Sequence, residues 1–203
     1  MEILYSDKDF IICVKPVGLD AEHQLPDALK REFGGEIFTL HRLDLNVGGV
    51  MVYARTKGAA ASLSRAIQEG TMVKEYVAKV HGQPPAEGDW SDLLWKDAKK
   101  NKVFVVKRER GGVKKARLEY RRLSTDADTS LVRIRLHTGR SHQIRVQFAS
   151  RGLPLVGERK YSALDDPCEI ALFSQRIGFY HPSTHDWMAF CHNPPEGFPW
   201  DVF

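Results

Sequence analysis

The chain has few cysteines and no long apolar segment. Among its 203 residues only Cys13, Cys168 and Cys191 are cysteines, and they are widely separated. Three widely separated cysteines indicate neither the dense framework of a disulfide-stabilised domain nor the close cysteine pairs of a common zinc site. No apolar run approaches the roughly 20 residues that a membrane-spanning helix needs, and the N-terminus lacks a basic region followed by an apolar one. We therefore expect a cytoplasmic protein with a single domain over residues 1–203.

Motifs for cofactors and metals are also missing. The sequence contains no Gly-rich loop of the kind that binds dinucleotides or phosphates. His41, His142 and His181 are the histidines with candidate roles, and their separations match no metal-site pattern. We expect no cofactor, no metal and a monomeric chain.

Basic residues are concentrated in one segment. Residues 96–122 contain twelve Lys or Arg against three acidic residues, a balance of +9 in a chain whose net charge is +4. Such asymmetry favours a polyanionic partner, most simply nucleic acid, since phosphate contacts dominate that kind of affinity. A basic hairpin that is merely solvated is the alternative.

Strand patterns outnumber helix patterns along the chain. Residues 131–137 alternate between apolar and polar side chains, which predicts a strand with one wet face. Residues 103–106 and 117–123 are predicted to pair as a basic hairpin, and apolar residues at spacings of three and four predict a helix over 57–69 that Gly70 ends. Strands follow one another without regular βα alternation, so we predict an α+β fold with a largely antiparallel sheet.

One carboxylate lies in a polar turn between two apolar segments. Asp44 follows residues 37–40 and precedes residues 50–54, both of them apolar. Rigid flanking strands would fix a catalytic carboxylate while the turn keeps it reachable. Aspartate is also a common turn residue that bonds its own backbone, and that reading stays open on spacing alone.

Several stretches, in order along the chain, resemble the RluA family of pseudouridine synthases. They are His41-Arg42-Leu43-Asp44, residues 74–82, residues 138–145 and residues 152–157 with Tyr161 after them. Lys15, Pro16 and Gly18 near the start and His181 with Pro182 near the end match the same family. The resemblance implies a mixed, mostly antiparallel sheet with peripheral helices and a central RNA-binding cleft. It also leaves no room for the separate N-terminal RNA-binding domain that longer members carry.

The resemblance assigns chemistry to three residues. Asp44 corresponds to the essential carboxylate of the family, which either attacks the ribose C1′ or removes the 2′ proton to give a glycal. Arg145 corresponds to the basic residue that pairs with this carboxylate, and Tyr76 to the tyrosine that stacks on the target base. The implied activity is isomerisation of specific uridines in structured RNA, either tRNA or rRNA.

The RNA-binding residues follow from the same likeness and from the basic segment. Arg42 corresponds to the residue that fills the gap left by a flipped uridine. We expect Arg140 and His142 to contact phosphate or to orient the turn, and the basic segment to contact phosphate through four lysines, Lys99, Lys100, Lys114 and Lys115.

The sequence departs from the family at two places. Val47 and Gly48 stand where a small polar pair such as Thr-Ser is usual, which puts the hydrogen bonding of the Asp44 turn in doubt. Glu158 stands where the family usually has aspartate. A non-catalytic RNA-binding or chaperone protein on the same fold is the alternative function. An Asp-based hydrolase would need a second carboxylate or a metal cluster, which the sequence does not offer.

Overall fold

The computed structural model describes residues 1–200, and within them the chain forms two compact units. The first comprises Met1–Glu75 and Phe173–Pro194, and the second comprises Tyr76–Leu172 with the described residues that follow Pro194. The single domain expected from the sequence stays a prediction. None of the helices within residues 1–200 has the length and apolar character needed to cross a membrane.

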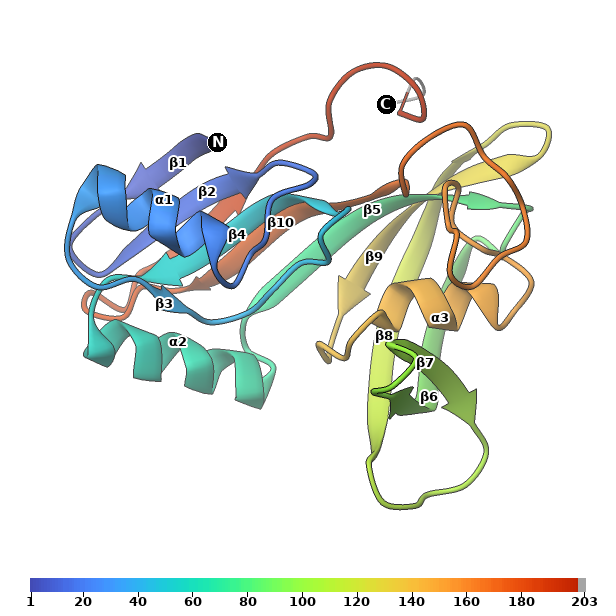
Figure 1. Cartoon of the computed structure of the whole chain (residues 1–203), viewed down its shortest axis with the longest axis horizontal. Coiled ribbons are helices and arrows are strands. Elements are labelled where there is room, and N and C mark those ends of the chain that lie inside the picture. The colour runs from blue at the N-terminus through green and yellow to red at the C-terminus, as the bar shows by residue number, and fades with distance from the viewer. Residues whose placement is uncertain (201–203) are drawn as a thin grey trace. The chain divides into compact units, whose positions relative to one another are not determined.

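The first unit is built on a twisted sheet (Figure 1). Its strands follow the order β1-β2-β4-β10-β11, with the short β3 beside β4. All neighbours are antiparallel except β4 and β10, which are parallel. The strands are β1 Glu2–Ser6, β2 Phe10–Lys15, β3 Phe38–Thr39, β4 Gly48–Ala54, β10 Leu172–Tyr180 and β11 Trp187–Cys191.

Two helices cover this sheet. Helix α2, Lys57–Glu69, begins after Thr56, whose side chain accepts the Ala59 N–H, and ends at Gly70 in the left-handed conformation. Its Leu63 packs with alternate residues of β2 and β4 in one apolar cluster. Helix α1, Gln24–Phe33, follows Ala21, whose carbonyl accepts the Tyr53 hydroxyl from the opposite face of β4. The predicted helix over 57–69 is confirmed.

The second unit carries the remaining strands and one helix. The strands β5 Val73–His81, β6 Glu87–Asp97, β7 Lys102–Val106, β8 Val113–Thr125 and β9 Thr129–Leu136 follow the order β5-β9-β8-β6-β7, and β5 enters this unit at Tyr76. Helix α3, Gln143–Ala149, packs on β6 through Phe148, whose ring lies edge-on to Trp90 at 4.6 Å. Val132, Ile134 and Leu136 of β9 are buried, as the alternation predicts.

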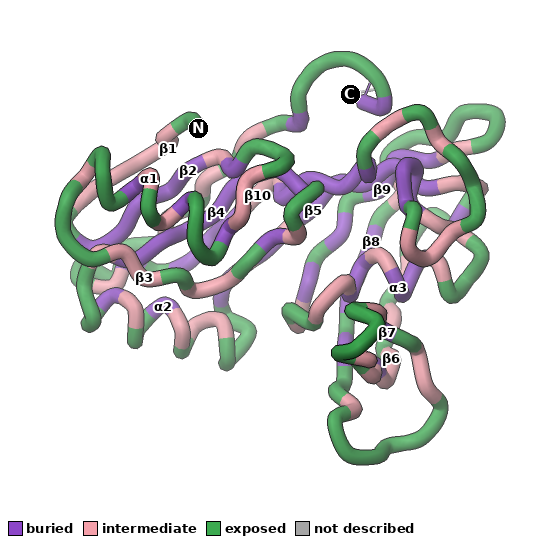
Figure 2. Tube along the Cα trace, viewed as in Figure 1, coloured by how far each residue is buried: buried purple, intermediate pink, exposed green. Residues whose placement is uncertain are grey.

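The predicted pairing of the basic hairpin is wrong. Strands β7 and β8 do not pair with each other, because β6 lies between them and pairs antiparallel with both. Strand β6 was missed because Asp, Gly and Ser are poor strand formers, and its two neighbours supply the hydrogen bonds that hold it extended. Figure 2 shows the connections at 98–101 and 107–112 exposed along their whole length.

The two units together contain a mixed, mostly antiparallel sheet with peripheral helices. The predicted α+β class is therefore confirmed.

Candidate active site

The Asp44 turn is closed by its own backbone. The Val47 N–H donates to the Asp44 carbonyl over 3.0 Å, which makes residues 44–47 a tight turn directly before β4. The Asp44 side chain is half-buried, whereas Leu45 at the next position is exposed. Asp44 thus lies at the entrance to a fully buried strand, as the apolar flanks predict.

A buried lysine ties this turn to β2. Lys15 is fully buried, and its ammonium donates to the Leu45 carbonyl over 3.1 Å and to the Pro16 carbonyl over 2.9 Å. The Gly18 N–H donates to the same Leu45 carbonyl over 2.9 Å. Burial lowers the pKa of Lys15 to about 8, while the negative charges of Asp20 and Asp44 act in the opposite direction. Sequence reasoning placed Lys15 in a loop motif only, and no local pattern signals its contact with Leu45.

The unusual Val47-Gly48 pair fits this arrangement. Val47 is buried, and a Cβ on Gly48 would come within 3.2 Å of the Lys15 carbonyl. Gly49 has a φ of +125°, and a Cβ there would lie 2.3 Å from the Ser174 carbonyl oxygen, so only glycine fits beside β10. The turn is oriented by backbone groups and by Lys15. Within the first unit, these contacts hold the turn without hydroxyl groups at positions 47 and 48.

His41 and Arg42 flank the turn on its N-terminal side. Burial lowers the pKa of His41 to about 3, and the charge of Lys74 adds to the shift. The neutral ring accepts the Val52 N–H at Nε2 over 3.2 Å, which anchors the segment before Asp44 to β4. Arg42 is exposed and pairs with Glu22 over 3.1 Å, a contact that solvent screens and that RNA can replace.

In the second unit, Arg145 on α3 is held by a buried carboxylate. Its Nε donates to Glu158 Oε2 over 2.6 Å and its Nη2 to Glu158 Oε1 over 2.9 Å, a bidentate pair. Burial alone would raise the pKa of Glu158, but Arg145 and two backbone N–H groups hold it below its ordinary value. The pairing of Arg145 with Asp44 that the family resemblance implies stays a prediction. Tyr76 is buried in β5, as the alternation of that strand allows.

The other two predicted RNA-binding residues before α3 are fixed by side-chain contacts. His142 has a φ of +49°, and its Nδ1 lies 2.7 Å from the Tyr161 hydroxyl. That hydroxyl also accepts the Val103 N–H over 2.8 Å, so Tyr161 links His142 to β7. Arg140 donates from Nε to the Lys115 carbonyl, which joins the turn before α3 to β8.

The four lysines of the basic segment that are predicted to contact phosphate, Lys99, Lys100, Lys114 and Lys115, are all exposed, and we call them the hairpin lysines. Lys99 and Lys100 lie in the β6–β7 connection, where their backbone N–H groups donate to Asp97 Oδ1. Lys114 and Lys115 lie at the start of β8. Lys115 is paired with Glu109 over 3.5 Å between two exposed side chains. Their ammonium groups are reachable by a polyanion.

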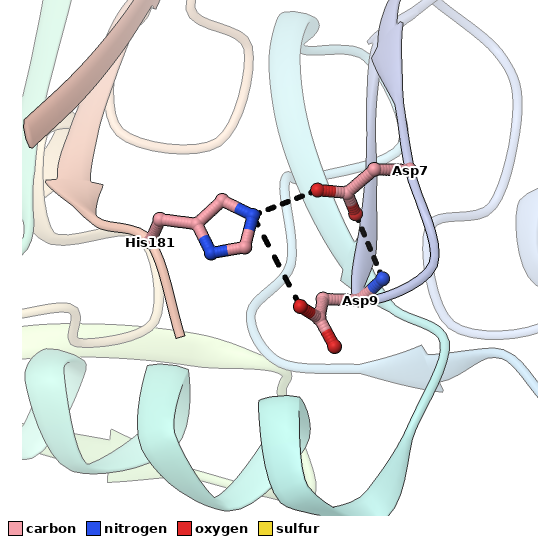
Figure 3. Close-up of side chains that lie close together, drawn as sticks. All are labelled: Asp7, Asp9 and His181. Atoms are coloured by element: carbon pink, nitrogen blue, oxygen red, sulfur yellow. Dashed lines mark hydrogen bonds and ion pairs between the residues drawn. The ribbon is translucent and has the colours of Figure 1, made fainter. Parts of the chain in front are cut away.

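One group of potential metal ligands lies within residues 1–200, and sequence spacing gave no signal of it. Asp7, Asp9 and His181 place ligand atoms within 4.8 Å of one another (Figure 3). His181 Nδ1 accepts the N–H groups of Ser183 and Thr184, so Nε2 carries the ring proton and donates to Asp7 over 2.8 Å. The cluster therefore acts as a hydrogen-bonded tie between the β1–β2 turn and the chain after β10.

The predicted site residues thus fall into two groups. Asp44 and Arg42 lie together before β4 in the first unit, whereas Tyr76, Arg140, His142, Arg145 and the hairpin lysines belong to the second unit. Sequence reasoning missed Lys15 and Tyr161 as supporting residues and gave Glu158 no function.

Comparison with known proteins identifies relatives over most of the chain. A family model described as RNA pseudouridylate synthase matches residues 9–150. The chain is 34% identical over 204 residues to the dual-specificity RNA pseudouridine synthase RluA of Escherichia coli, covering 93% of this chain and 90% of that one. It is 30% identical over 212 residues to the protein of the same name from Vibrio vulnificus, covering 98% and 84% of the two chains.

Solved structures show the same fold. The structure of human RNA pseudouridylate synthase domain containing 4 matches with a TM-score of 0.80 at 23% identity, covering 96% of this chain and 88% of that one. The structure of human RNA pseudouridylate synthase domain containing 1 matches with a TM-score of 0.79 at 23% identity, covering 96% and 83%.

Proposed function

Because the chain belongs to the RluA family of RNA pseudouridine synthases, we propose that it isomerises specific uridines in structured RNA to pseudouridine, with Asp44 as the catalytic carboxylate. The reaction breaks the bond from uracil N1 to the ribose C1′, turns the base and joins C5 to C1′. N1 gains a proton and C5 loses one, so the atoms of substrate and product balance. No redox step and no group donor is needed.

The observation that carries the proposal is the tethered turn of Asp44. Three contacts hold it: the Val47 N–H bonds the Asp44 carbonyl, and the Gly18 N–H and the Lys15 ammonium bond the Leu45 carbonyl, while Asp44 stays half-buried. A group that must meet a reacting carbon in one orientation gains from such rigidity, because little reorganisation is left for the reaction itself. Attack on C1′ and removal of the 2′ proton both require this carboxylate to be ionised.

We assign supporting roles to residues of the second unit. Arg145 supplies a positive charge held in a fixed orientation by Glu158. Tyr76 is buried in β5, and the family resemblance gives its ring the role of stacking on the target base. A uridine within a stem must be extruded to reach a carboxylate, and Arg42 is exposed before the turn, where a long side chain can fill the gap in the stack.

The substrate we propose is a compact stem-loop of tRNA or rRNA bound by a monomer. Arg140, His142 and the hairpin lysines would contact its backbone, since the lysines are exposed and carry positive charge within the basic segment. The relatives named dual-specificity RNA pseudouridine synthase support RNA as the substrate.

The test measures tritium release from RNA that carries C5-tritiated uridine. The wild-type protein should release tritium, and Asp44→Asn should release none while it folds and binds RNA as before, because asparagine keeps size and turn bonding but loses charge and nucleophilicity. Asp27→Asn, on the exposed side of α1, is the matched control and should keep full activity. Appreciable release by a folded Asp44→Asn protein would refute the assignment. Tight RNA binding by a wild-type protein without any release would favour the non-catalytic RNA-binding alternative.

A further inference from the structure

Glu158 is a buried carboxylate whose charge is balanced by Arg145. It is fully buried, and its carboxylate accepts the two Arg145 bonds together with the backbone N–H groups of Lys160 at 2.7 Å and Tyr161 at 3.2 Å. These four donors all bond oxygens of one carboxylate. The backbone N–H groups hold the buried carboxylate in place, and the carboxylate in turn holds the Arg145 guanidinium in one orientation.

The Arg145 guanidinium is bounded on a second side by Tyr161. The carbon at the centre of the guanidinium lies 5.7 Å from the centre of the Tyr161 ring, within the range of a cation–π contact. The Tyr161 ring is itself held, because its hydroxyl bonds Val103 of β7 and His142. The segment from Glu158 to Tyr161 therefore orients the guanidinium through two independent contacts.

We propose that Glu158 is a positioning residue for the isomerisation, acting through Arg145. This inference rests on the proposed function above and adds a residue to it. An arginine side chain that must be ordered at each turnover loses the conformational entropy of several rotatable bonds. A side chain that a bidentate ion pair already holds does not incur this loss. Glutamate suits this chain because its carboxylate must reach Arg145 on α3 and the backbone of its own loop at the same time.

The test compares Glu158→Gln and Glu158→Asp with Asp165→Asn, an exposed carboxylate of the same loop, as control. Glutamine turns an amide N–H₂ toward a set of donors, so we expect kcat to fall about 100-fold with KM for RNA nearly unchanged. Aspartate keeps the charge but is one methylene shorter and cannot serve both sides, so we expect a fall of about tenfold. Asp165→Asn should retain the kcat of the wild type.

A second arm separates positioning from general damage. In an Arg145→Lys enzyme, Glu158→Gln should lower kcat by less than about threefold, because lysine has no planar fork to misplace. An equal loss in both backgrounds would overturn the inference, as would a folded Glu158→Gln protein with wild-type kcat. If Glu158→Gln does not fold, Glu158→Asp decides, and a folded Glu158→Asp protein with wild-type kcat and KM overturns it. A wild-type protein that forms no pseudouridine would instead refute the proposed function.

Discussion

Replacing Lys15 by methionine should remove a pH dependence from the stability of the protein. Lys15 is fully buried under the Asp44 turn, and its nearest polar partners are the carbonyls of Pro16 and Leu45. Carbonyls accept hydrogen bonds but do not neutralise a charge, so burial still disfavours the charged form of Lys15. A neutral amine still has two N–H groups and can keep both bonds, which means that deprotonation relieves the charge without breaking the tether.

The size and sign of the effect follow from the pKa. Burial brings the pKa of Lys15 from 10.5 to about 8 in the folded protein. Between these values the unfolded chain binds a proton that the folded chain does not, so the free energy of unfolding rises with pH across this window. The shift corresponds to about 3 kcal/mol that is present above pH 10.5 and lost as the pH falls through about 8.

Denaturant unfolding at pH 7, 8.5 and 10 measures the effect. The free energy of unfolding of the wild type minus that of Lys15→Met should increase by roughly 2 to 3 kcal/mol over this range, because titrations shared by both proteins cancel in the difference. Lys57→Met changes an exposed lysine at the start of α2 and should give a flat difference. A flat difference for Lys15→Met as well would refute the reasoning, since it would mean that burial costs Lys15 nothing.

Three further results are expected. RNA affinity should fall steeply with salt. Neutralising the four hairpin lysines should reduce the slope of log K against log salt by roughly 0.7 to 0.9 for each lysine that contacts a phosphate. An unchanged slope would show that none of the four lysines contacts a phosphate. Arg42→Ala should slow turnover on a structured stem-loop more than on a flexible single strand, where flipping costs little, and equal losses would exclude the gap-filling role. Arg145→Ala should lower the free energy of unfolding at pH 7 by about 3 to 5 kcal/mol because it leaves the Glu158 carboxylate buried without its counter-charge, and that loss should shrink at low pH, where Glu158 can be protonated. Thermal or urea unfolding of a stable Arg145→Ala protein with no loss would contradict this.

Elements whose signals are local could be predicted from the sequence. The helix over 57–69 has its cap residue, its apolar spacing and its terminal glycine within one segment, and the observed bounds are the predicted ones. The strand predicted over 131–137 likewise appears as β9, with bounds that differ by one or two residues. The tight turn at Asp44 belongs to the same class, because the bond that closes it joins residues only three apart.

The pairing partners of the strands could not be predicted from the sequence. Residues 103–106 and 117–123 were correctly predicted to be strands, but both strands pair with β6, which has few strand-forming residues. Hydrogen-bonded neighbours on two sides and the packing of Trp90 against Phe148 make β6 a strand despite its composition. Neither the pairing with neighbouring strands nor the packing against α3 can be seen in the sequence of β6 alone.

The supporting contacts of the candidate site depended on the tertiary structure entirely. Sequence motifs singled out Asp44, Tyr76 and Arg145 as candidates, whereas Glu158, the partner of Arg145 within its unit, was noted only as a change from aspartate. The tie between Lys15 and Leu45 joins residues 30 apart, and the tie between Asp7 and His181 joins residues 174 apart. Such contacts form because strand register and loop closure bring donors and acceptors together, and a buried donor or acceptor must then bond whichever group the fold has placed beside it.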